Sequence, residues 1–570
     1  MLCSALAFCQ SPTWPPGGTT PSPYAISLDG GRFLPSTKRW NLVWSDQIVP
    51  NWVSAAQVEF AAQNYVGTQK IFANQVGQFR QFNSNFLCLS YHLAVGLNPA
   101  DNADCPLPHG NPGENPIGVV TPAGYVGEYA THFQPWLAVQ GIAEGSPSFE
   151  QMFQHYDLPD QAHRVWHHDP YWLMNLADAN WRKYQSETTI SWMKGNQNEG
   201  TFFDVAVETY AYFYHPRSND PTGFNWWQAP HGPVGFVGQF PSPDAFAPWQ
   251  NQHYLPYFQK LYTDFHAGAN DYLVMPNVDQ LVTTVYDPIW LDGDANGETV
   301  DGAMMEGFGD YTGFDMWLTL DRSVRHLTGR GKALIAQWYA SGAAERLRRT
   351  GMYMLVKNEN SYLNIQAGDV SWWPEYEIDL GEQSPIPTHL DALRVAGSGW
   401  ESLWRRDYAQ GMVLCNTADT PISYGLPAGD WFEIETSGGG PVGQNGVPPP
   451  SVVSLSDAPS PVIVAASGCQ IFSKTNTTAN HEAGKKVEKF RAYTKASANL
   501  IQVELVLNEA GRGFFELCDA SGRILQQFVA GELAAASHFI DLETCHLPAG
   551  IYVLRFKSRH YEAACKMCVY

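Results

Sequence analysis

The chain has 570 residues, of which 44% are hydrophobic, 13% aromatic and 16% charged, and its formal net charge is −22. This composition excludes disorder over most of the length, and the length predicts two or three domains. Because no basic stripe interrupts the negative charge, we expect neither nucleic acid nor an anionic membrane surface as a partner, and a strongly anionic polymer is a less favourable substrate.

The N-terminal residues 1–20 contain a short apolar segment with small residues near a cleavage point, but no positively charged start. We interpret this segment as a leader, a signal peptide whose start is truncated. No other run approaches the roughly 18 apolar residues that a membrane-spanning helix needs. The expected protein is therefore exported and has no membrane span.

Short apolar runs alternate with amphipathic helical stretches between residues 30 and 402. This alternation is typical of βα units around a parallel sheet, and eight runs are the number that a closed barrel requires. The fold prediction is therefore α/β, with a (β/α)8 TIM barrel as the catalytic domain. The predicted strands are residues 40–44, 86–91, 172–176, 201–203, 272–275, 302–305, 333–337 and 362–365.

Polar residues lie at the ends of these predicted strands. In a parallel barrel the C-terminal strand ends share one face, so residues remote in the chain are expected to converge on one site. A long segment over 212–249, rich in Pro, Gly and aromatic residues, is expected to shape that site. The strand-end residues are Asp46, His92, Asn175, Asp204, Asn277, Glu306, Gln337 and Gln366.

Two of these strand-end residues, Asp204 and Glu306, are carboxylic acids about a hundred residues apart. Cleavage of a glycosidic bond needs one carboxyl group to protonate the leaving oxygen and another to attack the anomeric carbon or to activate water. We therefore predict that Asp204 and Glu306 form the catalytic pair.

Alternatives to this pair stay open at this point. An acid after a strand is often only the N-cap of the following helix. Glu208 competes as the partner of Asp204, and Asp310 and Asp315 compete with Glu306.

Polar and aromatic residues are also candidates for substrate binding. We predict that Asp46, His92, Asn175, Asn277 and Gln337 bind the substrate, the uncharged ones as hydrogen-bonding partners of sugar hydroxyls, although helix capping or a role in the core would also explain them. Flat aromatic faces stack on sugar rings, and two Trp pairs lie in Gly/Pro-rich contexts. Their first members, Trp226 and Trp372, are the predicted stacking residues.

The segment 292–298 matches the first half of a calcium loop, with oxygen-bearing side chains at alternate positions and Gly at the sixth. Its candidate ligands are Asp292, Asp294 and Asn296. The twelfth position is Ala303, where a Glu ligand is expected, so a Gly/Asp-rich turn is the alternative. The proposed chemistry requires no cofactor, and this calcium would be structural. A metal site at 167–169 is disfavoured because no third ligand stands at a suitable spacing.

The helical pattern stops near residue 402. Short strand patterns predict a small β-domain over 403–473, and the polar segment 474–489 is interpreted as a linker. Alternating apolar and polar residues then predict a β-sandwich over 490–570.

Two parts of the chain resemble known families. Residues 514–524 and 547–555, with their Asp-x-x-Gly-Arg and Leu-Pro-Ala-Gly-Ile-Tyr-Val motifs, closely resemble the C-terminal sorting domain of type IX secretion cargo in bacteria of the Bacteroidota kind. This resemblance implies export to the cell surface or beyond by a secretion machinery that binds the domain. Residues 172–175, 200–204, 300–308 and 373–381 more loosely resemble a family of bacterial glycoside hydrolases.

The second resemblance implies an enzyme and carries Asp204 and Glu306 over as its catalytic acids. By analogy with retaining barrel enzymes that have an Asp nucleophile on the fourth strand, we assign Asp204 as nucleophile and Glu306 as general acid/base, with a raised pKa for Glu306. The predicted function is a secreted glycoside hydrolase that degrades a neutral or weakly charged polysaccharide. The alternative is an inactive barrel that binds glycans at the cell surface. A lyase or esterase is disfavoured because neither a Gly-x-Ser-x-Gly elbow nor a basic cluster is found.

Overall fold

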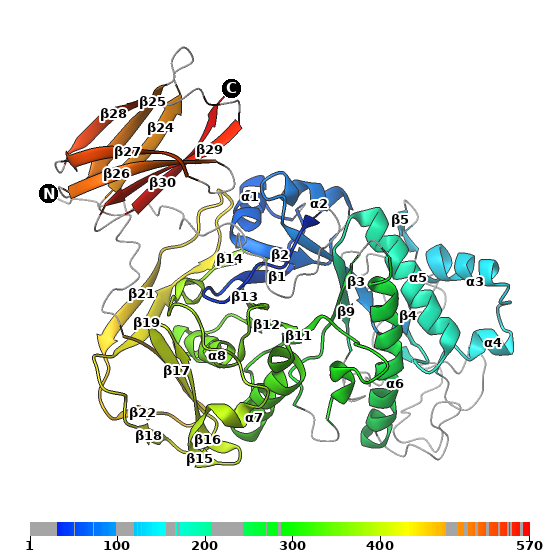
Figure 1. The fold of residues 1–570 in the computed structure, drawn as a ribbon. Coiled ribbons are helices and arrows are strands. Elements are labelled where there is room, and N and C mark those ends of the chain that lie inside the picture. Colours follow the sequence, from blue (N-terminus) through cyan, green and yellow to red (C-terminus); the bar gives the residue numbers. More distant parts are fainter. Residues whose placement is uncertain are drawn as a thin grey trace. The chain divides into compact units, whose positions relative to one another are not determined.

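The computed structural model divides the chain into two compact units, Met1–Asn476 and Thr477–Tyr570, each of which is considered by itself (Figure 1). The structure describes residues 31–50, 52–71, 73–97, 119–121, 124–126, 128–154, 166–167, 171–206, 243–268, 271–282, 287–474, 487–494, 500–507, 511–519, 524–533, 536–543, 547, 550–558 and 562–569. No helix in these described ranges has the length and apolarity to cross a bilayer.

The first unit is built around an eight-stranded parallel sheet (Figure 1). Its strands follow the chain order around the sheet, and its two edge strands, β10 and β11, also meet. The backbone N–H of Val278 donates to the Met304 carbonyl at 2.9 Å, and that of Asp301 donates to the Val274 carbonyl at 3.1 Å. These bonds close the sheet into a barrel. The strands are β1 (Val43–Gln47), β2 (Tyr65–Gln69), β3 (Leu87–Leu93), β9 (Gly200–Asp204), β10 (Leu273–Pro276), β11 (Gly302–Glu306), β12 (Ala333–Tyr339) and β13 (Ser361–Gln366).

The number of barrel strands predicted from the sequence is correct, but one of the predicted strands is wrong. The run at 172–176 does not enter the barrel, because β8 (Tyr171–Leu173) pairs antiparallel with β4 (Gly96–Leu97) and β7 (Trp166–His167). The second barrel strand is instead β2, which begins directly where a helix ends and which contains no apolar run. The two errors compensate, so Asp204 still ends the fourth strand.

Helices follow six of the barrel strands. Capping fixes where two of them begin: Ser54 and Gln57 form a reciprocal capping box at α1, and the Asp178 carboxylate accepts the N–H groups of Asn180 and Trp181 at α5. Between β10 and β11 the described residues contain only the 3₁₀ turn η5 (Ile289–Asp292). The helices are α1 (Ala55–Asn64), α2 (Ala73–Arg80), α5 (Ala179–Asn196), α6 (Pro243–Phe265), α7 (Gly313–Arg322) and α8 (Ala343–Val356).

An insertion between β3 and α5 packs against the outside of the barrel. Its Phe133 ring lies 4.7 Å from the ring of Tyr184 on α5, so aromatic contacts attach the insertion to that helix. The insertion contains β4, β5 (Val119–Thr121), β6 (Gly124–Val126), η2 (Tyr129–Phe133), α3 (Gln134–Gln140), α4 (Pro147–Glu150), β7 and β8.

The alternation of side chains along β9 places Asp204 inside the barrel. The Phe203 ring packs on Phe258 and Phe265 of α6, at 5.9 and 6.1 Å, so Phe203 faces the helices. Phe202 faces the interior, where its ring lies 6.1 Å from that of Tyr91 on β3. Since side chains of a strand alternate, Asp204 shares the inner face with Phe202.

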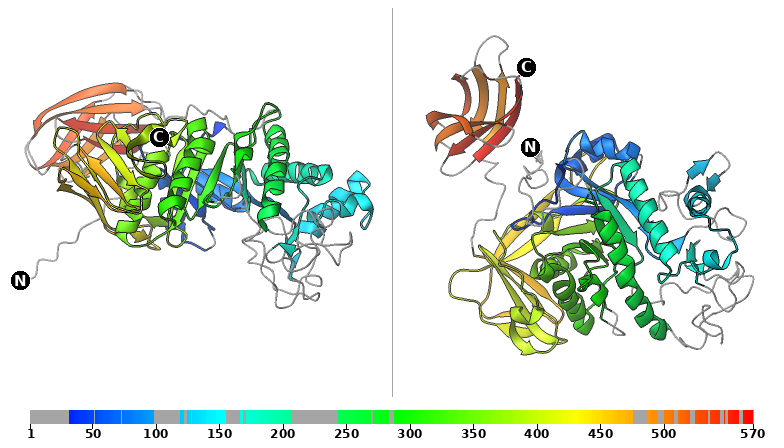
Figure 2. Two further views of the ribbon diagram at one scale, coloured as in Figure 1. Left: turned by 90° about the horizontal axis from the view of Figure 1, so that it is seen from below. Right: turned by 45° about the vertical axis from the view of Figure 1, so that its right-hand side comes forward.

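A β-domain follows the barrel and packs on α8 (Figure 2). The approach is close, because a Cβ at Gly351 of α8 would lie 2.7 Å from the Cβ of Cys469. Cys469 forms a disulfide with Cys415. The main sheet is antiparallel, in the order β15 (Arg394–Ser398), β16 (Glu401–Tyr408), β17 (Gly411–Asn416), β23 (Cys469–Ser473), β19 (Phe432–Gly438) and β21 (Ser451–Asp457). Two smaller pairs are β14 (Ser371–Trp372) with β20 (Gly440–Pro441), and β18 (Ile422–Tyr424) with β22 (Val462–Val464).

The second unit contains two antiparallel sheets around its own core, which includes Val503, Phe515 and Leu554. One sheet is β24 (Val487–Thr494), β25 (Leu500–Leu507) and β28 (Ser537–Glu543). The other is β27 (Ile524–Leu533), β26 (Gly511–Asp519), β29 (Gly550–Ser558) and β30 (Glu562–Val569). Two antiparallel sheets that share one apolar core form a β-sandwich.

Candidate active site

Asp204 and Glu306 end β9 and β11, and the structure brings their carboxyl groups together. The Asn277 side-chain nitrogen, Nδ2, donates to Asp204 Oδ1 and to Glu306 Oε2, each at 2.9 Å. The two acceptor oxygens are therefore separated by at most twice this distance. Asn277 follows β10, the strand between those of the two acids.

The orientation of the Asn277 amide is fixed by a further bond. Its Oδ1 accepts the backbone N–H of Asp279 at 3.1 Å, which leaves the NH₂ group toward the two acids. Asp279 has a φ of 52°, in the left-handed region that non-glycine residues rarely adopt. The turn after β10 thus orients the Asn277 side-chain NH₂ group toward the carboxyl groups of Asp204 and Glu306.

Each acid also has a tyrosine partner. The Tyr91 hydroxyl donates to Asp204 Oδ2 at 2.9 Å, and the Tyr339 hydroxyl donates to Glu306 Oε1 at 3.0 Å. Asp204 Oδ1 accepts a third donor, the N–H of Val205, at 2.9 Å. Asp204 therefore accepts three hydrogen bonds and Glu306 accepts two.

Burial and neighbouring charges raise two pKa values near the pair. The pKa of Glu306 is raised by burial and then by the charges of Asp204 and Asp46, against which the bonds from Asn277 and Tyr339 act. Burial, and after it the charges of Glu306 and Asp310, raises the pKa of Asp279 to about 6. Glu306 therefore has the raised pKa that the sequence predicts, and a general acid needs one.

A lysine and a further acid stand beside the pair. Lys70 directly follows β2, and its Nζ lies 3.1 and 3.2 Å from the two carboxylate oxygens of Asp46, at the end region of β1. The Asp46 carboxylate also accepts Gln69 Nε2 at 2.5 Å. Four carboxyl groups gather at these strand ends, those of Asp46, Asp204, Asp279 and Glu306. Among the described residues, Lys70 is the cation that bonds to one of them.

Amide side chains occupy the inner face on the last two barrel strands. Gln337 Oε1 accepts Asn364 Nδ2 at 2.9 Å, and Gln337 Nε2 donates to Gln366 Oε1 at 3.2 Å. Polar groups therefore line the described C-terminal ends of all eight strands, as the sequence predicts for Asp46, Asn277 and Gln337. Such a ring can donate to and accept from many hydroxyl groups.

Three of the predicted substrate-binding residues lie elsewhere. His92 is 2% exposed and lies beside Phe203 on the outer face of the barrel, where burial, and then the charge of His132, lowers its pKa to about 3. Asn175 follows β8, outside the barrel. Its side chain donates to the Gln151 carbonyl and accepts the N–H of Ala177, so it stabilises a turn.

Trp372 is the third correction. It is fully buried, stacked at 6.5 Å on Tyr65, and its indole N–H donates to Glu377. A side chain in the core offers no face to a sugar ring. Trp226 and Glu208 lie outside the described residues, as do two of the three residues at 167–169.

The rival acids after β11 form no hydrogen bond with Asp204 or Glu306 among the described contacts. Asp310 forms an ion pair with Arg349 of α8. Asp315 lies in the first turn of α7, where the partial positive charge of a helix N-terminus stabilises an acidic side chain.

The predicted calcium ligands do not share one set of contacts. Asp292 accepts His326 Nδ1 and Arg330, both at 2.8 Å. Asp294 instead accepts the N–H of Asn296 at 2.7 Å and Gln259 Nε2 at 2.6 Å. No group of three or more His, Cys, Asp or Glu side chains in the described chain is arranged to hold a metal ion. These contacts form a Gly/Asp-rich turn, and calcium at Asp292, Asp294 and Asn296 stays a prediction.

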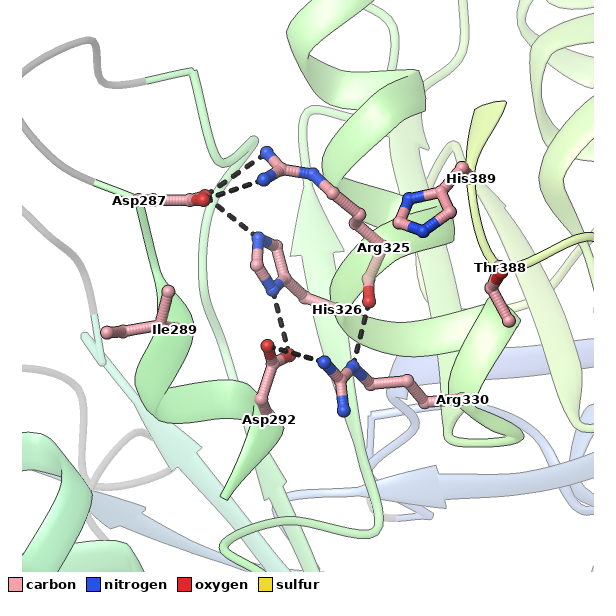
Figure 3. A pocket seen from close by; sticks show the side chains of 8 residues that line it. All are labelled: Asp287, Ile289, Asp292, Arg325, His326, Arg330, Thr388 and His389. Carbon is pink, nitrogen blue, oxygen red and sulfur yellow. Dashed lines mark hydrogen bonds and ion pairs between the residues drawn. The ribbon is translucent and has the colours of Figure 1, made fainter. Parts of the chain in front are cut away.

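A cavity of about 410 Å³ lies near the N-terminal ends of β11 and β12, away from the strand ends that carry the acids (Figure 3). His326 stands between two carboxylates there, with Nε2 at 2.9 Å from Asp287 and Nδ1 at 2.8 Å from Asp292. Arg325 also donates to Asp287, at 2.7 and 3.2 Å. Every carboxylate of this group has a cationic partner.

Sequence reasoning missed Lys70, Tyr91, Asp279 and Tyr339. Lys70 and Asp279 follow strands by one and three residues, in turns without an apolar pattern. Tyr91 and Tyr339 lie on the inner face, but aromatic residues in a strand are usually core. A search for polar groups on alternate positions of each strand would have found the two tyrosines.

Comparisons with known proteins give only distant similarity. No protein-family model and no curated protein matches the chain. Among solved structures, a cycloisomaltooligosaccharide glucanotransferase from Paenibacillus sp. is 9% identical with a TM-score of 0.28, over 88% of this chain and 85% of that one. A xylosidase from Aspergillus niger is 9% identical with a TM-score of 0.36, over 77% of this chain and 64% of that one.

A third similar structure concerns a smaller part of the chain. It is a DUF3244 family protein with an immunoglobulin-like β-sandwich fold from Bacteroides vulgatus, 14% identical with a TM-score of 0.12 over 14% of this chain and 83% of that one. At such TM-scores these similarities carry no argument about activity. The strand pairing of this chain defines the barrel without them.

Proposed function

We propose that the chain is a glycoside hydrolase that retains the anomeric configuration, with Asp204 as nucleophile and Glu306 as general acid/base. The observation that supports this most is the shared bond to Asn277. Two oxygens bonded to one nitrogen are closer than the roughly 6.5 to 9.5 Å that an inverting pair needs for its water, and they approach the roughly 5 to 5.5 Å of a retaining pair.

In the first step Asp204 attacks the anomeric carbon while Glu306 gives its proton to the leaving oxygen. The bond to the leaving group breaks and a glycosyl ester of Asp204 forms. In the second step Glu306, now a carboxylate, takes a proton from water, whose oxygen displaces Asp204. The donor bonds on Asp204 and the raised pKa of Glu306 agree with these starting states. The reaction needs no cofactor.

The substrate proposed is a neutral or weakly charged polysaccharide. Asp46, Asp204 and Glu306 lie around one lysine that already bonds to Asp46, and the charge of Glu306 also acts on Asp279, so an anionic sugar would meet repulsion. We further propose that the barrel domain covers residues 30–402, the β-domain 403–473 and the linker 474–489. On its sequence resemblance, residues 490–570 are proposed as an address for the secretion machinery that places the protein at the cell surface or outside.

The test is the release of reducing ends from a panel of neutral, cationic and anionic polysaccharides. Wild type is compared with D204N, E306Q and, as matched control, D321N, which makes the same change in an acid of α7 that forms an ion pair with Arg325. We expect turnover by wild type and D321N and its loss in the other two. Turnover at the wild-type rate by D204N would overturn the assignment, and binding without turnover by wild type would favour an inactive, glycan-binding barrel.

A further inference from the structure

Lys70 occupies an unusual position beside the catalytic candidates. It is the first residue after β2, and its φ of 64° lies in the left-handed region. This conformation costs a residue that has a Cβ about 1 kcal/mol or more, so surrounding contacts must hold it. The contacts are those of its ammonium group with Asp46, at 3.1 and 3.2 Å.

Two aromatic rings connect Lys70 to Asp204. The Lys70 Nζ lies 5.3 Å from the ring centre of Tyr91 and 5.4 Å from that of Phe202. Tyr91 is the residue whose hydroxyl donates to Asp204, and Phe202 precedes Asp204 by two positions on the same inner face. The ammonium therefore lies on the Asp204 side of the pair, whereas Glu306 faces Tyr339 and Asn277.

The charges around Lys70 explain why it stays protonated. Burial acts against the ammonium, but the charges of Asp46, Asp204 and Glu306 outweigh it and raise the pKa of Lys70. The described titratable groups that face this site are Asp46 from β1, Lys70, Tyr91 from β3, Asp204 from β9, Asp279 after β10, Glu306 from β11 and Tyr339 from β12. Lys70 is the positive member of this set.

We propose that Lys70 is a positioning residue that acts through charge: it holds Asp204 as the carboxylate, so that the proton of the pair resides on Glu306. This inference rests on the proposed function and adds to it the residue that decides which acid is the nucleophile. Asp46 moderates the effect, because its bond to the ammonium offsets part of the positive charge that Asp204 would otherwise meet.

The experiment measures kcat/KM against pH for wild type and three variants, on a saccharide that the wild type cleaves. K70M removes the cation but keeps the size of the side chain. In this variant the acid limb, which is the low-pH side of the kcat/KM profile, should move to higher pH by about one unit. In K70R the limb should stay near its wild-type position. In D46N the limb should move to lower pH, because the ammonium loses its competing carboxylate.

A control separates this effect from a change in net charge. K38M removes a lysine of an exposed ion pair with Glu382, remote from the strand ends that carry the acids, and should leave the acid limb unmoved. A shift in K70M that K70R does not show supports the inference, and K70Q, which also removes the cation, tests it in the same way if K70M does not fold. The D46N shift is the expected companion result, to which the direct charge of Asp46 on Glu306 also contributes. An acid limb that moves in neither variant overturns the role of Lys70 alone, whereas a wild type without turnover on any saccharide overturns the proposed function as well.

Discussion

The two ends of the barrel differ in the partners of their carboxyl groups, which are cationic at one end and mainly neutral at the other. Near the N-terminal ends of β11 and β12, Asp287 and Asp292 are each bonded to His326 and to an arginine (Figure 3). At the C-terminal ends, Asp204 and Glu306 share an amide and bond to tyrosines. Matched charges stabilise a fold, whereas like charges held together by neutral donors cost stability and hold a proton ready for transfer.

Strained backbone is frequent at the C-terminal end of the barrel. Among the described residues, four non-glycine residues with left-handed φ angles lie shortly after barrel strands, namely Lys70, Val205, Asp279 and Leu281, whereas one, Gln197, lies shortly before a barrel strand. Val205 is β-branched, for which this conformation is least favourable. Such strain persists where the surrounding structure imposes it, and it is common at functional sites. The C-terminal face combines both costs, which is why we place the chemistry there.

The largest expected effect is a loss of turnover when Asp204, at the C-terminal end of the barrel, is replaced. D204N should lower kcat by about 10⁴-fold or more, because the proposed reaction loses its nucleophile. Single-turnover kinetics on a cleaved saccharide would measure this. D287N serves as its counterpart at the other end and should lower the melting temperature while leaving kcat nearly unchanged at 25 °C.

The next effect concerns stability at the opposite end. His326 is 2% exposed and bonds to two carboxylates, each of which keeps an arginine partner in H326A. Because two hydrogen bonds to charged groups are lost, we expect a loss of about 3 kcal/mol in the free energy of unfolding, measured by denaturant titration. Unchanged stability would mean that the two ends do not differ in the way described.

A third variant tests how the pair is held. N277A removes the amide that bonds to both acids and should lower kcat by about 10²-fold with a smaller change in KM, since misplaced reacting groups lose rate. N277D adds a third carboxylate at the same place and should move both limbs of the pH profile to higher pH. An unmoved profile in N277D would contradict the assigned contacts.

The smallest effect is a gain in stability. The pKa of Asp279 is raised from 3.8 to about 6, so folding favours its protonated form, and that stability is present below pH 3.8 and lost as pH rises through 6. D279N keeps a residue that tolerates left-handed φ and should be more stable than wild type by about 1 to 2 kcal/mol at pH 8. At pH 3.5 the two melting temperatures should coincide.

The sequence predicted the acids because an apolar run that ends in a carboxylate needs only local information. It could not predict which face His92 presents, because β3 extends two residues beyond its apolar run and a shift of one position reverses the face. Lys70 and Asp279 depend on left-handed turns, which only the closed barrel imposes. The Gly/Pro-rich sequence around Trp372 favoured an exposed loop, but Tyr65 and Phe60 pack on its ring and bury it.

The central claim is that Asp204 forms a covalent bond with the sugar while Glu306 transfers the proton. It is tested most directly by treating the enzyme with 2-deoxy-2-fluoroglycosyl fluorides of several sugars and analysing its peptides by mass spectrometry. We predict one added fluoroglycosyl group on the peptide that carries Asp204, and none in D204N. A label on Glu306 or Asp279, or an active enzyme that none of these reagents labels while it inverts the anomeric configuration, would contradict the account.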